Sequence, residues 1–109
     1  MINTIILLLT MHWVSDFILQ SDQMAKNKSS SLKWLAIHVA VYIIPFFLFG
    51  WVFALVNGVL HFAIDFFTSK LNKYLWDRQR VHWFFVGVGF DQLLHAICLL
   101  VTFDKLIGG

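Results

Sequence analysis

Long apolar stretches alternate with two short basic segments along the chain. Trp34 to Phe67 is a run of 34 residues without Lys, Arg or Glu, and Asp65 is its only acid. As one helix this run would be about 51 Å long, well beyond the ~30 Å of a bilayer's hydrocarbon core. We therefore expect the chain to turn back at Gly50, with Pro45 kinking or weakening the helix just before the turn.

Four apolar spans follow from this division: residues 3–20, 32–49, 51–69 and 82–103. The chain is 60% hydrophobic and 13% charged, against roughly 45–50% and about 25% in globular proteins, which excludes an ordinary soluble fold. We expect an all-α fold: a polytopic membrane protein with a four-transmembrane-helix bundle that forms one domain over residues 1–109. The first span lacks the basic start and cleavage site of a signal peptide, so we expect a retained helix.

Seven of the eight Lys and Arg residues fall in the two basic segments. They are Lys26, Lys28 and Lys33 in the first segment, and Lys70, Lys73, Arg78 and Arg80 in the second. Loops rich in Lys and Arg stay on the cytoplasmic side of a membrane, which accounts for this clustering without a nucleic-acid partner. We therefore expect both basic loops in the cytoplasm and both termini to be extracytoplasmic.

Histidine and aspartate recur four residues apart inside the apolar spans. The pairs are His12 with Asp16, His61 with Asp65 and, in reverse order, Asp91 with His95. Residues four apart lie on one face of a helix with Cβ atoms about 5–6 Å apart, so each pair can present an imidazole and a carboxylate to the same point. One such pair is more often an interhelical hydrogen bond, but three pairs favour a common site.

These pairs and His38 are expected at one depth in the membrane. Counted from the basic ends of the spans, Asp16 and Asp65 lie about four residues in, His38 about six and Asp91 about nine, or roughly 6–14 Å. A charged side chain costs about 2.5–3.5 kcal/mol at the bilayer centre, and the spans contain no Lys or Arg at this depth. A divalent metal is the simplest compensating charge, because carboxylates and neutral imidazoles are common metal ligands.

Seven residues are therefore candidate metal ligands: His12, Asp16, His38, His61, Asp65, Asp91 and His95. A single catalytic zinc needs three protein ligands, so the surplus favours two ions about 3.5–4 Å apart, bridged by Asp65 or Asp91. Zinc is the expected metal, with manganese as the alternative. Asp16 and Asp65 are the candidate catalytic residues, and either Asp16 or a metal-bound hydroxide would be the base.

Four other polar residues are candidates for orienting ligands or contacting substrate: Gln20, Asn57, Gln92 and Lys70. Gln20 and Asn57 continue the polar faces of the first and third spans by one turn, where simple interhelical bonding is an equal alternative. Gln92 adjoins Asp91 but points about 100° away on an ideal helix. Lys70 could hold a lipid phosphate, although membrane topology alone also accounts for it.

The motifs described above carry a resemblance to a known family. The run HWVSDFILQSDQMAKNK, His38, Asn57-x3-His61-x3-Asp65 and FDQLLH resemble a family of short, largely uncharacterised bacterial and phage membrane proteins with the signature HxxxDFxLQ. More distantly, the chain is similar to membrane-bound metal-dependent hydrolases and to the all-α zinc phospholipase C and nuclease superfamily. This likeness implies a bacterial inner-membrane protein, zinc and phosphoester hydrolysis. The superfamily's glutamate ligands have no counterpart, because the chain contains no Glu.

Three functions are open at this point. The first is an integral membrane metal-dependent hydrolase acting on a lipid or phosphoester at the cytoplasmic leaflet. The second is a small ion, proton or metal transporter, for which the outer halves of the spans offer little polar lining. The third is a structural or regulatory subunit in which the metal staples a small bundle. The expected partners are membrane lipid, a lipid or phosphoester substrate and, as a further alternative, other copies of the chain; nucleic acid is not expected.

Overall fold

Helices form nearly all of the protein, which is described over residues 2–108 by a computed structural model. The main helices are α1 (Ile2–Trp13), α2 (Asp22–Asn27), α3 (Leu32–Ile43), α4 (Trp51–Asp77) and α5 (Val81–Phe103). Three short segments continue some of them: the π-helical η1 (Val14–Ile18) and η3 (Asp104–Gly108) and the 3-10-helical η2 (Ile44–Phe49). No strand occurs within residues 2–108, so the expected all-α class is confirmed.

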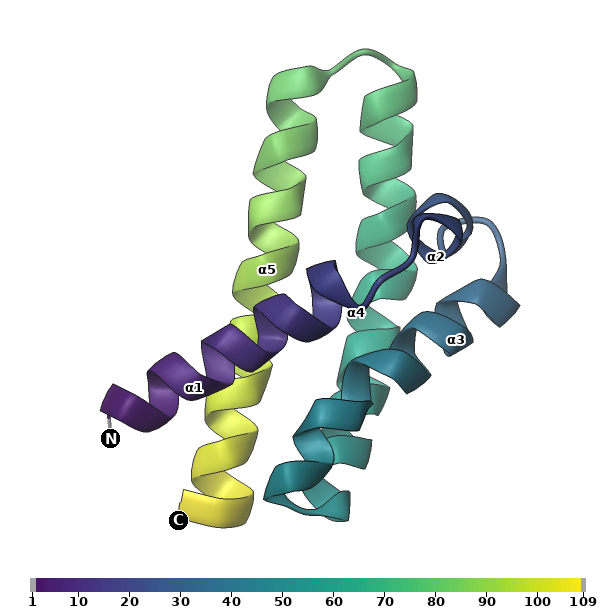
Figure 1. Cartoon of the computed structure of the whole chain (residues 1–109). Coiled ribbons are helices and arrows are strands. Elements are labelled where there is room, and N and C mark those ends of the chain that lie inside the picture. Colours follow the sequence, from purple (N-terminus) through teal and green to yellow (C-terminus); the bar gives the residue numbers. More distant parts are fainter. Residues whose placement is uncertain (1, 109) are drawn as a thin grey trace.

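An antiparallel hairpin of α4 and α5 is the frame of the fold (Figure 1). The two helices are joined by a tight turn at residues 78–80, where the backbone N–H of Arg80 donates to the carbonyl of Leu75 at 2.9 Å. In Figure 1, α1 and α3 cross this hairpin obliquely, and α2 lies beside the start of α3. The start of α1, the end of η3 and the α3–α4 connection lie toward one end of the hairpin, opposite the 78–80 turn.

Three helices are long and apolar enough to cross a membrane: Leu32–Phe49, Trp51–Asp77 and Val81–Gly108. The N-terminal apolar helix Ile2–Ile18 is shorter, at 17 residues, so a bundle of four spans stays a prediction. The third span differs from its expected boundary, because α4 continues past residue 69 to Asp77. Its last residues contain neither Gly nor Pro, so nothing in the local sequence stops the helix where the apolar pattern ends.

The burial pattern is inverted relative to that of a soluble protein. Large apolar side chains line the outside of the described helices, with Leu48 77% exposed and Val59 71% exposed. The buried residues instead include more polar or charged side chains than hydrophobic ones. This distribution is the one expected of helices that meet lipid outside and one another's polar groups inside.

The buried hydrophobic core lies between the α3–α4 connection and the buried polar residues. Its members are Leu8, Tyr42, Phe46, Phe53, Ala54 and Leu99. Each of α1, α3, α4 and α5 contributes at least one of these side chains, together with the 3-10 segment η2. This apolar layer therefore fixes the spacing of the helices that carry the buried polar residues.

The α3–α4 connection confirms the turn expected at Gly50. The α-helix α3 ends at Ile43, and Pro45 lies in the 3-10 segment that follows. Gly50 adopts φ 115° and ψ 154°, a backbone region essentially restricted to glycine, and its N–H donates to the carbonyl of Phe47 at 3.0 Å. Proline ends the α-helix because it lacks the N–H needed for the next hydrogen bond, and glycine then allows the reversal.

The substitution Gly50→Ala should lower the free energy of unfolding by roughly 1–3 kcal/mol, because a Cβ strains this backbone conformation. No atom lies within 4 Å of the added Cβ, so crowding plays no part. Gly89→Ala is the matched control: Gly89 is helical and equally uncrowded, so this change should be neutral or slightly stabilising. Unfolding in detergent micelles with increasing SDS, followed by circular dichroism, measures both. Equal stability of the two variants would contradict the requirement for glycine.

Candidate metal centre

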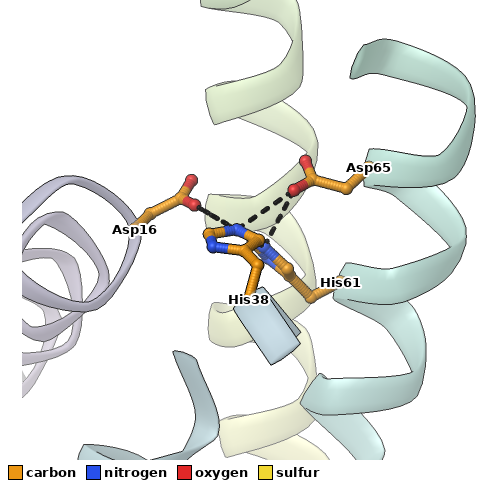
Figure 2. A group of neighbouring side chains, drawn as sticks. All are labelled: Asp16, His38, His61 and Asp65. Atoms are coloured by element: carbon orange, nitrogen blue, oxygen red, sulfur yellow. Dashed lines mark hydrogen bonds and ion pairs between the residues drawn. The ribbon is translucent and has the colours of Figure 1, made fainter. Parts of the chain in front are cut away.

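Buried His and Asp side chains from η1, α3, α4 and α5 converge in the middle of the molecule. Two groups have ligand atoms that all lie within 4.8 Å of one another. The first group consists of Asp16, His38, His61 and Asp65, and the second of Asp16, Asp91 and His95. Figure 2 shows the first group, with Asp16 facing the two imidazoles from one side and Asp65 from the other. Six of the seven residues expected from the sequence are thus brought together, and they could hold a metal ion.

The first group has the spacing of a tetrahedral ligand set. Nε2 of His38 lies 3.0 Å from Nε2 of His61 and 3.0 Å from Oδ1 of Asp16. Oδ2 of Asp65 lies 3.2 Å from each of the two imidazole nitrogens. Ligand atoms about 2.0–2.1 Å from a tetrahedral zinc are ~3.3 Å from one another, so these separations fit one ion with four protein ligands.

The second group contains an unpartnered imidazole nitrogen. Nε2 of His95 lies 3.4 Å from Oδ1 of Asp65 and 3.6 Å from Oδ1 of Asp91. This nitrogen is buried and has no hydrogen-bond partner among residues 2–108. Buried polar atoms almost always have a partner, and a cation shared by this nitrogen and the two carboxylates could supply one.

Asp16 and Asp65 each reach both groups. Asp16 is a member of both, while Asp65 faces His38 and His61 with Oδ2 and His95 with Oδ1. The sequence pointed to Asp65 or Asp91 as a bridging carboxylate. In the structure Asp91 lies in the second group alone, so Asp16 and Asp65 have the placement that a bridge requires.

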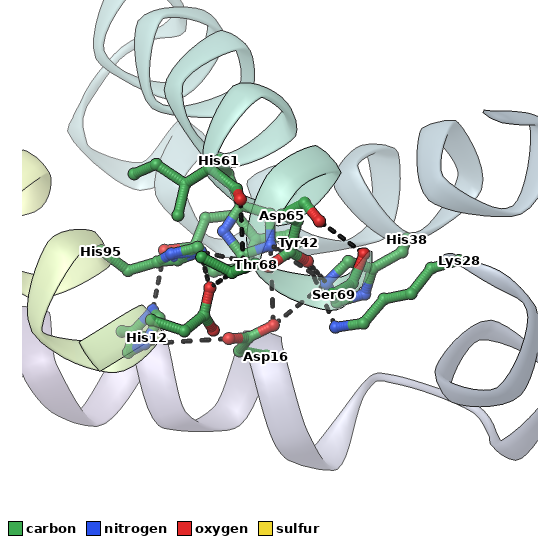
Figure 3. Close-up of polar contacts among 12 residues, drawn as sticks. His12, Asp16, Lys28, His38, Tyr42, His61, Asp65, Thr68, Ser69 and His95 are labelled. Atoms are coloured by element: carbon green, nitrogen blue, oxygen red, sulfur yellow. Dashed lines mark hydrogen bonds and ion pairs between the residues drawn. The ribbon is translucent and has the colours of Figure 1, made fainter. Parts of the chain in front are cut away.

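His12 is the candidate ligand that lies outside both groups. Its Nδ1 accepts a hydrogen bond from the Tyr42 hydroxyl at 2.8 Å, and its Nε2 donates to Oε1 of Gln92 (Figure 3). Nε2 of His12 is 3.9 Å from Oδ2 of Asp16, too far for a hydrogen bond. Both ring nitrogens of His12 are therefore used by Tyr42 and Gln92 and are not directed at the carboxylates.

Gln92 connects three residues of the cluster. Its Nε2 donates to Oδ2 of Asp91 at 3.1 Å and to Oδ2 of Asp16 at 3.3 Å, while its Oε1 accepts from His12. The backbone of Gln92 is turned away from Asp91 as the helical spacing requires, but the side chain is long enough to reach back. These are the contacts that a residue orienting metal ligands would make.

Asn57 and Lys70 do not contact the cluster in the structure. Asn57 donates to the carbonyl of Phe53 at 3.0 Å and to the hydroxyl of Thr102 at 2.9 Å, so it ties α4 to α5 on the side away from the carboxylates. Lys70 donates to the backbone carbonyl of Ser29 and so holds the connection between α2 and α3. These contacts favour interhelical bonding over ligand orientation for Asn57.

Lys28 is a cluster residue that the sequence argument missed. Its Nζ lies 3.2 Å from Oδ2 of Asp65, and its side chain is 17% exposed (Figure 3). Lys28 follows α2, whose start is capped by the Ser21 hydroxyl accepting from the N–H of Met24. Lys28 lies just outside the expected spans, and a lysine in that position can extend its side chain inward.

Thr68 and Tyr42 also contact candidate ligands without having been singled out. The Thr68 hydroxyl donates to Oδ1 of Asp91, and the ring of Tyr42 stacks on His61 with centroids 3.8 Å apart and an interplanar angle of 17°. Thr68 lies three residues after Asp65, and Tyr42 four after His38. Residues at these spacings share a helix face, which is the signal that could have identified both.

A pocket of about 620 Å³ opens onto the carboxylates Asp16, Asp65 and Asp91. Its volume lies within the roughly 300–1,000 Å³ of typical small-molecule sites. Gln20, the remaining candidate, also lines the pocket. The other walls combine lysines with aromatic side chains along α2, α4 and α5: Lys26, Lys28, Lys73, Trp76, Phe84 and Phe85. The pocket therefore runs from the cluster toward the 78–80 turn.

Replacing Gln92→Leu should lower the free energy of unfolding by about 1–3 kcal/mol, since it leaves His12, Asp16 and Asp91 each without one hydrogen-bond partner. Gln23→Leu on the exposed side of α2 is the control and should change stability by no more than about 0.5 kcal/mol. SDS titration of both variants compares them. A Gln92→Leu protein as stable as the control would show that these hydrogen bonds do not hold the cluster.

Comparison with protein families gives one match. Residues 4–108 match a family described as a protein of unknown function (DUF3307), and the match includes both groups of candidate ligands. No curated protein and no solved structure matches the chain. This result agrees with the resemblance to an uncharacterised family and adds no support for the likeness to hydrolases. The chain belongs to the DUF3307 family.

Proposed function

We propose that the protein is an integral membrane hydrolase that uses two divalent metal ions, zinc or manganese, to cleave a lipid or phosphoester at the cytoplasmic leaflet. The observation that carries this proposal is that three carboxylates of the ligand groups, Asp16, Asp65 and Asp91, line an open pocket. A purely structural metal site is closed, whereas a catalytic one keeps a position for substrate. The pocket supplies that access.

The charges of the cluster can accommodate one or two ions, and the proposed reaction favours two. Lys28 offsets one of the three carboxylates, and one divalent ion would offset the other two. A second ion would make the site net positive, which suits the negative charge that develops in phosphoester cleavage. The first group offers four ligands and the second offers three, so a tetrahedral ion in the second group would keep one position for water or substrate.

Asp16 and Asp65 are the proposed catalytic carboxylates. Bound metal ions would supply Lewis acidity and a water nucleophile available at neutral pH. The chain's own residues would hold the reacting groups in place: Gln92 fixes Asp16 and Asp91, and Thr68 fixes the second oxygen of Asp91. Asp16 borders the pocket and is thus positioned to accept a proton from an attacking water.

The proposed topology has four membrane crossings, with Ile2–Ile18 as the first. In this arrangement the basic segment around α2 and the 78–80 turn face the cytoplasm, in agreement with the positive-inside rule. The start of α1, the α3–α4 connection and the end of η3 lie toward the other end of the hairpin (Figure 1), which supports extracytoplasmic termini. The pocket then opens on the cytoplasmic side of the bundle.

Transport is a weaker explanation of the same residues. A path through the bundle would have to continue beyond the cluster on the side away from the pocket. That side is filled by the buried hydrophobic core, in which Leu8, Phe46 and Leu99 are completely buried. An ion or proton path needs polar groups or water at every depth, and the polar side chains on this side, such as Tyr42, Asn57 and Thr102, are few and already engaged in hydrogen bonds. If the metal only stabilised the packing of the helices, as in a structural subunit, the pocket would have no function.

Elemental mass spectrometry on detergent-purified protein should find close to two equivalents of zinc or manganese per chain. Asp16→Asn should lower the content of both sites, since Asp16 belongs to both groups, whereas His95→Gln should remove the second ion alone. His82→Gln is the matched control, because this exposed imidazole lies outside both groups. Wild-type protein without stoichiometric metal would remove the basis of the proposal.

Metal-loaded protein in mixed micelles should hydrolyse a lipid phosphoester, with activity lost on chelation and restored by zinc. Asp16→Asn should lower kcat by at least about 10²–10⁴-fold, because it removes the proposed general base and also a ligand of both groups. The His82→Gln protein should retain wild-type activity. Two bound ions with no turnover of any phosphoester, lipid or amide would contradict the hydrolase and leave the metal centre standing.

A further inference from the structure

The walls of the pocket suit one class of ligand. We infer that the pocket binds a phosphate ester that carries an apolar chain, with the phosphate beside Lys28 and the chain along Trp76, Phe84 and Phe85. This inference rests on the proposed function, because it assigns the substrate of the same site. It narrows the proposed substrate from a lipid or phosphoester to a lipid phosphate.

Two lysines give the pocket an anion-binding side. Lys28 lies where the pocket meets the cluster, and Lys26 lines it from α2 with no ion pair among residues 2–108. Lys73 also lines the pocket, but its charge is shared with Asp77, whose Oδ2 is 3.0 Å away. Lysine ammonium groups are common phosphate partners, so Lys26 and Lys28 are the residues for this role.

Lys28 and the first metal ion would compete for the same oxygen. Oδ2 of Asp65 is the atom that contacts Lys28, and it is also the atom that faces His38 and His61. A metal bound by the two imidazoles would take over this oxygen. The ammonium of Lys28 would then be released at the edge of the pocket, where a phosphate on the metal centre is its nearest new partner.

Unsatisfied amides give the pocket further polar contacts. Oε1 of Gln20 and Oδ1 of Asn72 are buried without a hydrogen-bond partner among residues 2–108, and both residues line the pocket. Buried polar atoms are rarely left in this state. The oxygen of Asn72 lies against Gly87, and each of the two residues also has an NH₂ group that can donate to a phosphate oxygen.

The opposite wall is aromatic and open. Trp76 and Phe84 pack together with ring centroids 5.0 Å apart, and Phe85 beside them is 63% exposed. In Figure 1 the part of the α4–α5 hairpin near the 78–80 turn is not covered by α1 or α3. A free phosphate would leave this wall unused, and a neutral lipid would leave the lysines unpaired. An amphiphile with an anionic head uses both.

The test is the binding of a single-chain alkyl phosphonate, which has the charge of the phosphate ester but cannot be hydrolysed. Zinc-loaded protein in neutral detergent micelles is titrated by calorimetry, and the metal content of each sample is measured in parallel. The phosphonate should bind at least 10-fold more tightly than the alcohol of the same chain length and than inorganic phosphate. Replacing Lys26→Gln and Lys28→Gln should weaken binding about 5-fold for each lysine, with the metal retained.

Lys33→Gln is the matched control, because Lys33 is exposed on α3 and does not line the pocket. Phe85→Gln should weaken the phosphonate and leave inorganic phosphate unchanged, since only the chain meets this ring. Equal affinity for phosphonate and alcohol, or lysine variants that bind as wild type while holding their metal, would overturn the assignment and leave the metal centre intact. Equal affinity for inorganic phosphate would overturn the apolar half.

Purified wild-type protein that contains no metal would contradict the proposed metal-dependent hydrolase, but not by itself the lipid-phosphate pocket. Phosphonate binding that still depends on Lys26 and Lys28 would then support the lipid-phosphate pocket by itself. If the metal-free wild-type protein did not bind the phosphonate, both proposals would be contradicted.

Discussion

Three carboxylates buried among lipid-facing helices are the constraint on which the rest of the structure depends. Each of Asp16, Asp65 and Asp91 has protein partners: imidazoles around the first two, Lys28 on Asp65, and Gln92 with Thr68 on Asp91. These partners come from α3, α4, α5 and the connection after α2, so the helices must meet at one level. A carboxylate left unpaired at that level would cost several kcal/mol, which is comparable to the whole stability of a small domain.

The irregular parts of the helices help to bring the buried His and Asp side chains together. Asp16 lies in the π-helical segment after α1 and faces His38, and the 3-10 segment with Gly50 returns the chain so that α4 can place His61 against α3. The sequence spacing alone would direct His12 and Asp16 to one point. In the structure they have separate tasks, because His12 is engaged by Tyr42 and Gln92.

Apolar runs, basic loops and helical spacing were enough to predict an all-helical chain, the reversal at Gly50 and the identity of six clustered residues. The same reasoning could not place His12, since its hydrogen bonds to Tyr42 and Gln92 depend on how α3 and α5 pack against α1. It also missed Lys28, whose contact with Asp65 depends on how a loop folds back. Hydrophobicity marks the apolar span 51–69, whereas α4 continues to Asp77, because a helix ends only where the backbone is stopped.

The division of ligands among helices has a consequence for biosynthesis. The first group is complete once Asp65 has been made, since all four of its members precede α5. The second group needs Asp91 and His95, which lie on the last helix. Because a chain is synthesised from its N-terminus, the two groups come into existence at different times. A nascent chain of α1 to α4 would already carry one complete set of ligands, and the arrival of α5 would decide when the second is assembled.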